Sequence, residues 1–146
     1  MKISIGSDHA GFQAKERLRE MLEAEGHTVY DKGTNSEEST DYPDYGHAVA
    51  KSVSSGECER GILVCGTGIG MCMTANKTPG VRAALVHDEF TTEMSRKHNN
   101  ANVLCMGTRV LDEETILRLT KIWLSTEFGG DRHALRVEKI EGGIKS

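Results

Sequence analysis

Residues 64–77, VCGTGIGMCMTANK, place a cysteine at the end of an apolar run, directly before three glycines at alternate positions. The loop that follows the cysteine consists of Gly66, Thr67, Gly68, Ile69 and Gly70, and so little side chain leaves its backbone N–H groups exposed. The helix expected next points its positive end at the same space, which suits a phosphate or a developing oxyanion. A tight turn without a ligand is the alternative, although two glycines usually suffice for a turn.

Three familiar uses of a glycine-rich loop do not match these residues. The P-loop pattern G-x-x-x-x-G-K-[ST] does not occur in the chain. The dinucleotide fingerprint G-x-G-x-x-G would put its third glycine at Met71, and only Asp88 stands where a ribose-binding acid would. A cysteine phosphatase needs an arginine six residues after its cysteine, which is again the position of Met71. A phosphocysteine carrier at Cys65 is a further alternative.

The chemistry that best suits Cys65 is that of a base. A thiol has a pKa of about 8.5, which a helix N-terminus lowers, so a thiolate can accept a proton near neutral pH. A base beside donors for an oxyanion can remove a proton α to a carbonyl and give an enediolate. Such a reaction moves hydrogen without net oxidation, so we expect no cofactor and no metal.

Other polar groups stand beside the predicted strands, and each also has an ordinary structural explanation. Asp8 and His9 follow the first strand, where they could hold a sugar phosphate or serve as a helix cap and a core histidine. Arg132 and Arg136 are four residues apart, so they share a helix face that could bind phosphate or simply face solvent. Three more residues flank the fifth strand, His98 and Asn99 before it and Arg109 after it.

Short apolar runs alternate with helical periodicity along the chain. The predicted strands are 2–7, 27–31, 61–65, 82–86 and 102–107, and a helix follows each, with a long loop over 32–46 and a second helix over about 45–55. Asp112 is expected to cap the helix after the fifth strand, and a last helix runs over about 132–141. The pattern predicts a three-layer α/β/α sandwich with a five-stranded parallel sheet, which is Rossmann-like, with strand 1 beside strand 3.

The overall composition restricts the function further. A chain of 146 residues predicts one domain over 1–146, and a net charge of −4 gives no general attraction to nucleic acid or to an anionic membrane. We see no membrane span or signal peptide, so we expect a soluble, cytoplasmic protein. The four cysteines form no C-x-x-C pair and no zinc pattern, so Cys72 and Cys105 are expected to be small buried hydrophobes and Cys58 a loop residue.

Five separated motifs resemble type B ribose-5-phosphate isomerase, within the wider family of ribose, galactose and allose phosphate isomerases. They are GSDHAG, CGTGIGM…ANK, RAALVHD, HNNANVLCMGTRV and the terminal R-H-x-x-R, and in order they cover about residues 1–142. The resemblance implies a homodimer, possibly a dimer of dimers, whose sites lie between two subunits, with the helix at about 132–141 packing on the partner. It also implies a small sugar phosphate as substrate, no cofactor, and no nucleic-acid or membrane partner.

The resemblance also implies a role for each matching residue. Cys65 would move a proton between C2 and C1, Thr67 would bind near the reacting oxygens, and His98 would open the sugar ring. The remaining positions would form the anion cradle or bind phosphate and sugar oxygens: Asp8, His9, Gly66, Gly68, Ile69, Gly70, Asn99, Arg109, Arg132 and Arg136. One branch of the family carries a glutamate base at the position of Met71, so this chain falls in the cysteine branch.

The implied activity is the interconversion of ribose 5-phosphate and ribulose 5-phosphate. The same chemistry on allose 6-phosphate or galactose 6-phosphate is the nearest alternative. A nucleotide-binding regulatory module that uses the glycine loop and Asp88 is a more distant one. Cys72 and Met73 replace the smaller residues more common at these positions, which we interpret as a variation in packing.

Overall fold

The apolar runs form the strands of one parallel sheet in the computed structural model, which describes residues 1–142. The strands are β1 (Lys2–Ser7), β2 (Thr28–Asp31), β3 (Arg60–Cys65), β4 (Ala83–Leu85) and β5 (Val103–Gly107). Their order across the sheet is β2-β1-β3-β5-β4, and all neighbours are parallel. The predicted fold is therefore confirmed, and so is the pairing of strand 1 with strand 3, whose register runs from Ile3↔Arg60 to Ser7↔Val64.

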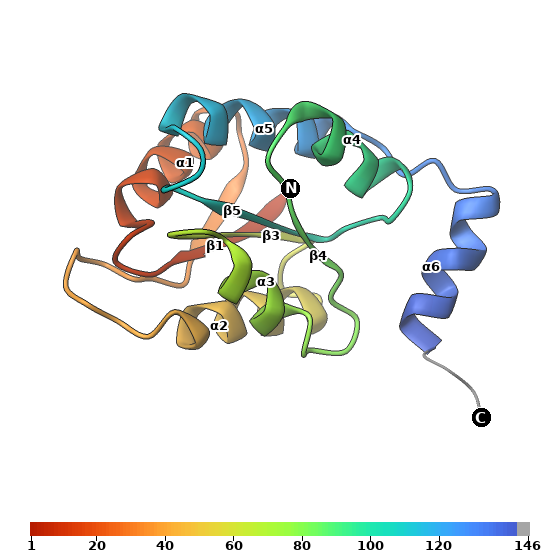
Figure 1. Ribbon diagram of the computed structural model, residues 1–146, viewed down its shortest axis with the longest axis horizontal. Helices are drawn as coiled ribbons and strands as arrows, with labels where there is room; N and C mark the ends of the chain where they lie inside the picture. The colour runs from red at the N-terminus through yellow and green to blue at the C-terminus, as the bar shows by residue number, and fades with distance from the viewer. Residues whose placement is uncertain (143–146) are drawn as a thin grey trace.

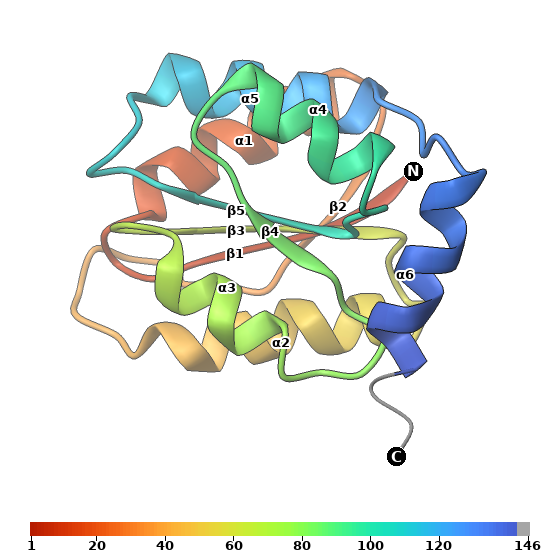
Figure 2. The same ribbon diagram turned by 45° about the vertical axis from the view of Figure 1, so that its right-hand side comes forward.

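Helices cover both faces of this sheet (Figure 1). The helices are α1 (Phe12–Ala24), α2 (Tyr42–Ser54), α3 (Ile69–Ala75), α4 (Glu89–Lys97), α5 (Glu113–Ser125) and α6 (Arg132–Gly142). Helices α1, α4 and α5 lie on one face and α2 and α3 on the other, while α6 lies beside one end of the sheet, outside both layers (Figures 1 and 2). None of the helices within residues 1–142 has the length and hydropathy needed to cross a bilayer.

Strand β3 shows why the sequence has a continuous apolar run here. Ile62 and Val64 belong to the apolar cluster under α1 and α5, whereas Leu63 and Cys65 belong to the cluster under α2 and α3. Side chains alternate between the faces of a strand, so a strand covered on both faces needs an apolar residue at every position.

Several predicted boundaries shift. Helix α2 begins at Tyr42 instead of about residue 45, because Asp41 lies at its N-cap and Pro43 falls in the first turn, where the missing N–H costs nothing. The connection after β2 is correspondingly shorter than predicted and covers 32–41. Strand β4 is shorter than the predicted 82–86, whereas the cap at Asp112 is confirmed, since its carboxylate accepts a hydrogen bond from the Thr115 N–H at 2.8 Å. The predicted domain also includes residues 143–146, which lie outside the described part of the chain.

Candidate active site

Cys65 is the last residue of β3 and lies at the carboxyl edge of the sheet. Its side chain is 5% exposed, and the Gly68 N–H donates a hydrogen bond to Sγ with 3.1 Å between nitrogen and sulfur. The carbonyl of Cys65 accepts a hydrogen bond from the Thr108 N–H at 3.0 Å, which ties the end of β3 to the segment after β5. The sulfur is therefore held by the glycine loop that follows it, and the backbone of Cys65 is held by the segment after β5.

The glycine loop has a conformation that its sequence makes possible. Gly68 has φ +83°, in the left-handed region, and a Cβ there would lie 2.6 Å from Leu85 Cδ1 and 2.9 Å from the carbonyl carbon of Met106. The Ile69 N–H donates to Thr67 Oγ1 at 3.2 Å, and the Thr67 side chain faces solvent. The first turn of α3 also contains N–H groups that have no acceptor within the helix, so the loop offers donors to an anion.

Asp8 and His9 reach the same edge of the sheet because β1 pairs with β3. Asp8 is buried, and its Oδ1 accepts a hydrogen bond from the Gly11 N–H at 3.1 Å. His9 Nδ1 accepts a hydrogen bond from the Thr40 N–H at 3.2 Å, so Nε2 carries the ring proton in the neutral form and remains a donor. Asp8 thus has one carboxylate oxygen engaged in the turn, and His9 has a fixed tautomer.

Arg109 completes this group. It follows β5, its backbone N–H donates to the Gly66 carbonyl at 2.9 Å, and a Cβ on Gly66 would lie 3.3 Å from Arg109 Nη1. The guanidinium therefore lies over the start of the loop. We name the residues gathered at this edge the Cys65 group: Asp8, His9, Cys65, Gly66, Thr67, Gly68, Ile69, Gly70 and Arg109.

The other predicted site residues form a second group. His98 is the C-cap of α4, and its ring stacks on His133 of α6 with 4.1 Å between ring centroids and 16° between planes. A cavity of about 410 Å³ here is lined by Lys97, His98, Gly129, Asp131, Arg132 and His133. We name His98, Asn99, Arg132 and Arg136 the His98 group, and all four are exposed.

The His98 group is rich in positive charge. Burial lowers the pKa of His133, and the nearby His98, Arg132 and Arg136 lower it further. These groups repel a proton on His133 for the same reason that they would attract an anion. The use of the two arginines for phosphate stays a prediction.

The two groups lie at opposite ends of the sheet. The Cys65 group follows the carboxyl ends of β1, β3 and β5, whereas His98 precedes β5 and α6 lies at the far end (Figures 1 and 2). Strand β5 spans residues 103–107, and at about 3.3 Å per residue its two ends are roughly 13 Å apart. The chain thus brings together the predicted base and its anion cradle but leaves the predicted ring-opening acid and the arginines elsewhere.

Tyr42 belongs beside the Cys65 group although none of the sequence motifs includes it. A Cβ on Gly70 would lie 2.5 Å from Tyr42 Cε2, so the phenol ring packs directly on the loop at the start of α3. The sequence Asp41-Tyr42-Pro43 could have indicated that a helix begins here, because an N-cap aspartate precedes a proline in the first turn. The stretch was instead predicted as a loop, so the start of α2 was not placed at the site.

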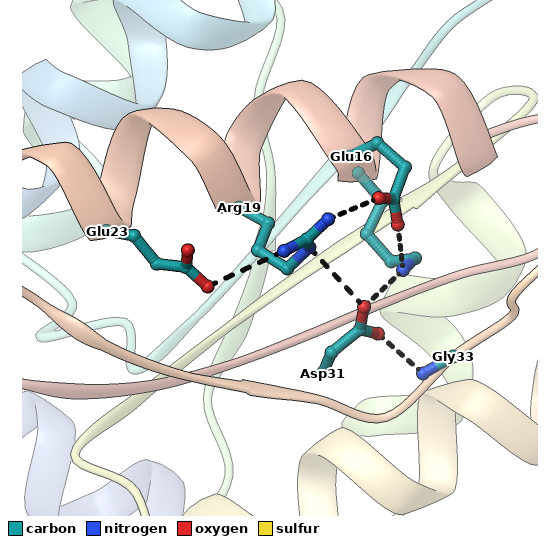
Figure 3. A network of polar contacts seen from close by, with 6 residues as sticks. Glu16, Arg19, Glu23, Asp31 and Gly33 are labelled. Atoms are coloured by element: carbon teal, nitrogen blue, oxygen red, sulfur yellow. Dashed lines mark hydrogen bonds and ion pairs between the residues drawn. The ribbon is translucent and has the colours of Figure 1, made fainter.

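A buried amine fixes the connection that leads to Tyr42. The Lys15 side chain is 0% exposed, and its Nζ lies 2.7 Å from Asp31 Oδ2 and 3.0 Å from Glu16 Oε1. Asp31 Oδ1 accepts a hydrogen bond from the Gly33 N–H at 2.9 Å, and Figure 3 shows this carboxylate between the helix and the loop. Hydrogen bonds from Arg19 and Lys15 lower the pKa of Glu16.

The same connection clamps the end of β1. The Gly33 carbonyl accepts a hydrogen bond from the Ser7 N–H at 2.8 Å, and the Thr34 N–H donates to the Ser7 carbonyl at 2.9 Å. Asp8 follows directly, so the ion pair of Lys15 with Asp31 supports the backbone that presents Asp8 and His9.

Two alternative kinds of site gain no support from the geometry. Asp88 Oδ1 accepts hydrogen bonds from the Thr91 N–H at 2.7 Å and from Thr91 Oγ1 at 2.8 Å, so this carboxylate caps α4. This capping role accounts for the position of Asp88 without a bound ribose. Within residues 1–142, no three His, Cys, Asp or Glu side chains are grouped so that they could hold a metal ion.

Comparison with known proteins gives consistent results across sequence and structure. Residues 3–140 match the sequence model of the Ribose/Galactose Isomerase family. The chain is 44% identical to ribose-5-phosphate isomerase B of Escherichia coli over 139 residues, covering 95% of this chain and 93% of that protein. It is 41% identical to D-erythrulose-4-phosphate isomerase of Pectobacterium atrosepticum over 141 residues, covering 96% of this chain and 93% of that protein.

Solved structures are equally similar. Ribose-5-phosphate isomerase B of Clostridium thermocellum superposes with a TM-score of 0.96 at 49% identity, covering 97% of this chain and 96% of that one. Ribose-5-phosphate isomerase B of Mycoplasma genitalium, solved with bound ribulose 5-phosphate, superposes with a TM-score of 0.93 at 40% identity, covering 97% and 94%. The similarity therefore extends over nearly the whole length of both partners.

Proposed function

Because the chain belongs to the ribose/galactose isomerase family, we propose that it interconverts ribose 5-phosphate and ribulose 5-phosphate through an enediolate. It is an aldose–ketose isomerase, and its substrate is a sugar phosphate. The resemblance to type B ribose-5-phosphate isomerase drawn from the five motifs is confirmed. We further propose that it acts in the cytoplasm as a homodimer, without a cofactor.

The observation that carries the proposed mechanism is the position of the Cys65 thiol. The sulfur lies at the end of β3 and accepts a hydrogen bond from the Gly68 N–H, with 3.1 Å between nitrogen and sulfur. It therefore lies beside the N–H donors of the glycine loop. In the open-chain aldose, the Cys65 thiolate would take the proton from C2 while the electron pair forms a C1–C2 double bond and the carbonyl oxygen becomes an oxyanion. The loop N–H groups would stabilise that oxyanion. The proton of the C2 hydroxyl would then pass to O1, C2 would become the ketone carbon, and the thiol would return the first proton to C1.

The separation of the two groups supports a shared site. In one chain, the His98 group lies across the sheet from Cys65, so neither His98 nor the arginines can reach a sugar held at the glycine loop. A two-fold dimer presents the same surface of each copy to the other, so it could bring the His98 group of one copy onto the Cys65 group of its neighbour. His98 would then protonate the ring oxygen, and Arg132 and Arg136 would bind the phosphate.

A four-carbon substrate is the second candidate, since a relative that is 41% identical over nearly its full length is named D-erythrulose-4-phosphate isomerase. Measurement of kcat/KM for aldose phosphates of four, five and six carbons, including allose 6-phosphate, tests the substrate class. We expect ribose 5-phosphate to be the best of the series. A higher value for a four- or six-carbon substrate would contradict the assignment.

The role of the thiol is tested by Cys65→Ala beside the matched variant Cys58→Ala. Cys58 is also a buried free thiol, but it lies outside both groups. Loss of a positioned acid–base group costs about 10²–10⁴ in rate, and more where it is the sole proton carrier. We expect that loss for Cys65→Ala with unchanged affinity for a phosphate ligand, and near-normal turnover for Cys58→Ala. Normal turnover by Cys65→Ala would remove the thiol from the mechanism.

A further inference from the structure

Helix α6 carries two residues of the His98 group, yet little apolar contact holds it in place. It lies beside one end of the sheet (Figures 1 and 2), and within its described residues, 132–142, only Val137 is buried. The proposed function needs Arg132 and Arg136 at a fixed place relative to His98, because one sugar phosphate must meet all three. Polar contacts between α6 and the rest of the chain must therefore supply this precision.

The turn that follows α4 and carries His98 is closed by its own backbone. The Asn100 N–H donates a hydrogen bond to the Arg96 carbonyl at 3.1 Å. The Ala101 N–H donates to the Ser95 carbonyl at 2.9 Å. Asn100 has φ +47°, and a left-handed residue that bonds to the carbonyl four residues earlier ends many helices. The position of His98 therefore depends on how this turn is held.

The Arg96 side chain fastens the turn from within. It is 5% exposed, and its Nη1 donates to Asn100 Oδ1 at 2.9 Å and to the Ala101 carbonyl at 2.7 Å. Its Nε donates to the Thr126 carbonyl at 3.1 Å, in the segment between α5 and α6. Because a guanidinium is rigid and planar, it fixes these three acceptors relative to one another. Arg96 thus joins the turn to the segment that leads into α6.

A second arginine contacts the Asn100 backbone. Arg82, which precedes β4, donates from Nε to the Asn100 carbonyl at 3.0 Å and from Nη1 to Glu141 Oε1 at 2.6 Å. Glu141 lies in the last turn of α6, so this ion pair ties that end of the helix to the turn. Asn100 is therefore linked to the chain before α6 through Arg96 and to the end of α6 through Arg82.

We propose that Asn100 and Arg96 are positioning residues of the proposed isomerase, which hold His98 against α6 so that it reaches the ring oxygen of a sugar whose phosphate is bound by that helix. The stack of His98 on His133, with 4.1 Å between ring centroids, is the contact that this arrangement produces. Neither positioning residue needs to touch the sugar, since each acts through His98. A displacement of about 1 Å costs on the order of 10² in rate, so a loosened turn slows ring opening.

NMR tests the geometry without a substrate and independently of the proposed function. The stacked rings should give a nuclear Overhauser effect between the ring protons of His98 and His133, with His98→Asn and His133→Asn assigning the signals. Asn100→Gly adopts positive φ readily but lacks the oxygen that Arg96 binds, whereas Asn100→Asp keeps that oxygen and tolerates the conformation. We expect the effect to weaken in Asn100→Gly and to persist in Asn100→Asp. No effect in the wild type, or one of wild-type size in Asn100→Gly, would overturn the proposal.

The consequence for the rate, which rests on the proposed function, is tested with two matched arginine variants. The guanidinium carbons of Arg96 and Arg60 lie 5.9 Å and 5.2 Å from the centroid of the Trp123 ring. Arg60 donates to the Trp123 carbonyl at 3.2 Å, whereas Arg96 donates to the turn. Arg96→Lys and Arg60→Lys keep the charge of each residue but remove its planar fork.

Arg96→Lys should lower kcat/KM for ribose 5-phosphate by about 10² and affect erythrose 4-phosphate less, because that sugar has no furanose to open. Asn100→Gly should show the same selective loss, Asn100→Asp should restore the rate, and Arg60→Lys should lose nothing selectively. Equal losses on both sugars in Arg96→Lys and Asn100→Gly, or a selective loss in Arg60→Lys, would overturn the positioning role. If the wild type isomerises neither sugar, the proposed function fails, and the Overhauser comparison alone decides whether Asn100 positions His98.

Discussion

The backbone N–H of Gly68 donates a hydrogen bond to Cys65 Sγ across 3.1 Å, so the glycine loop folds back on the thiol that precedes it. This contact depends on the left-handed conformation of Gly68, with φ +83°. The loop and the thiol therefore form one unit, and a change in the loop conformation should displace the sulfur.

Gly68→Ala tests this unit. An alanine in the left-handed region costs about 1–2 kcal/mol, and its Cβ would also collide with Leu85 and with the Met106 backbone. Gly56 is a matched control, since its φ is also +83° and a Cβ at that position would have no neighbour within 4 Å. We expect both variants to be destabilised in urea unfolding, but only Gly68→Ala to lose kcat, by about 10² if the loop moves by about 1 Å. Equal kcat for the two variants would contradict the coupling.

The proposed ring-opening role of His98 can be tested with two substrates. Ribose 5-phosphate closes to a furanose, whereas erythrose 4-phosphate cannot, because its O4 is esterified. His98→Asn should therefore lower kcat/KM for ribose 5-phosphate by about 10²–10⁴, as for loss of a general acid, and should affect erythrose 4-phosphate far less. The control is His133→Asn, which changes the residue that stacks on His98 but leaves His98 itself in place. Equal losses on both substrates would exclude a specific ring-opening role.

The sequence predicts the central strands well because their burial on both faces leaves a clear pattern, as in β3. The separation of the two groups of site residues could also have been predicted. His98 stands before the fifth strand and Cys65 at the end of the third, and parallel strands put those positions at opposite edges of a sheet. The burial of Lys15 had no such signal. FQAKERLREML reads as an amphipathic helix, and Asp31, the partner of Lys15, lies 16 residues further along the chain in β2.

Removing one partner of the buried Lys15–Asp31 ion pair should destabilise the fold more than removing the other. Asp31→Ala leaves a fully buried amine with Glu16 as its remaining partner, and breaking a buried pair costs about 3–5 kcal/mol. Lys15→Met removes the charge and keeps the apolar stem, and the Asp31 side chain, 24% exposed, can still be hydrated. We expect Asp31→Ala to lower the urea midpoint more than Lys15→Met does.

The control for this comparison is Lys32→Met. Lys32 pairs with Glu57 at 2.7 Å, but both side chains are partly exposed, and such pairs contribute about 0–1 kcal/mol. An Asp31→Ala variant that is no less stable than Lys32→Met would show that Lys15 finds another partner or water.

The histidine stack predicts a pH dependence. The folded-state pKa of His133 lies below its ordinary 6.5, through burial and the charges of His98, Arg132 and Arg136. Below about pH 6.5 the unfolded chain binds a proton that the folded chain does not, so stability is lost as pH falls from about 6.5 toward the folded pKa. His133→Asn should reduce this loss in urea midpoints measured between about pH 7 and about pH 5. The exposed His47→Asn should leave it unchanged, and an unchanged slope in His133→Asn would contradict the assignment.

The proposed site between two subunits can be tested with mixtures of two inactive variants. Cys65→Ala lacks the base but keeps both arginines, whereas the double variant Arg132→Ala/Arg136→Ala keeps the base but cannot hold phosphate. Each homodimer should be nearly inactive, because charge-assisted phosphate contacts supply both affinity and orientation. In a mixed dimer, one pocket combines an intact Cys65 from one chain with intact arginines from the other, as two-fold symmetry requires.

Subunit exchange should therefore restore activity, up to about half of the wild-type value per mixed dimer, since one of two equivalent pockets is complete. Native mass spectrometry counts the mixed dimers, and each variant exchanged with itself is the control. If the arginines served their own subunit, the pocket with Cys65 would still lack them and the pocket with arginines would still lack the thiol. Confirmed mixed dimers without recovered activity would thus place Arg132 and Arg136 in their own chain's site or in no site.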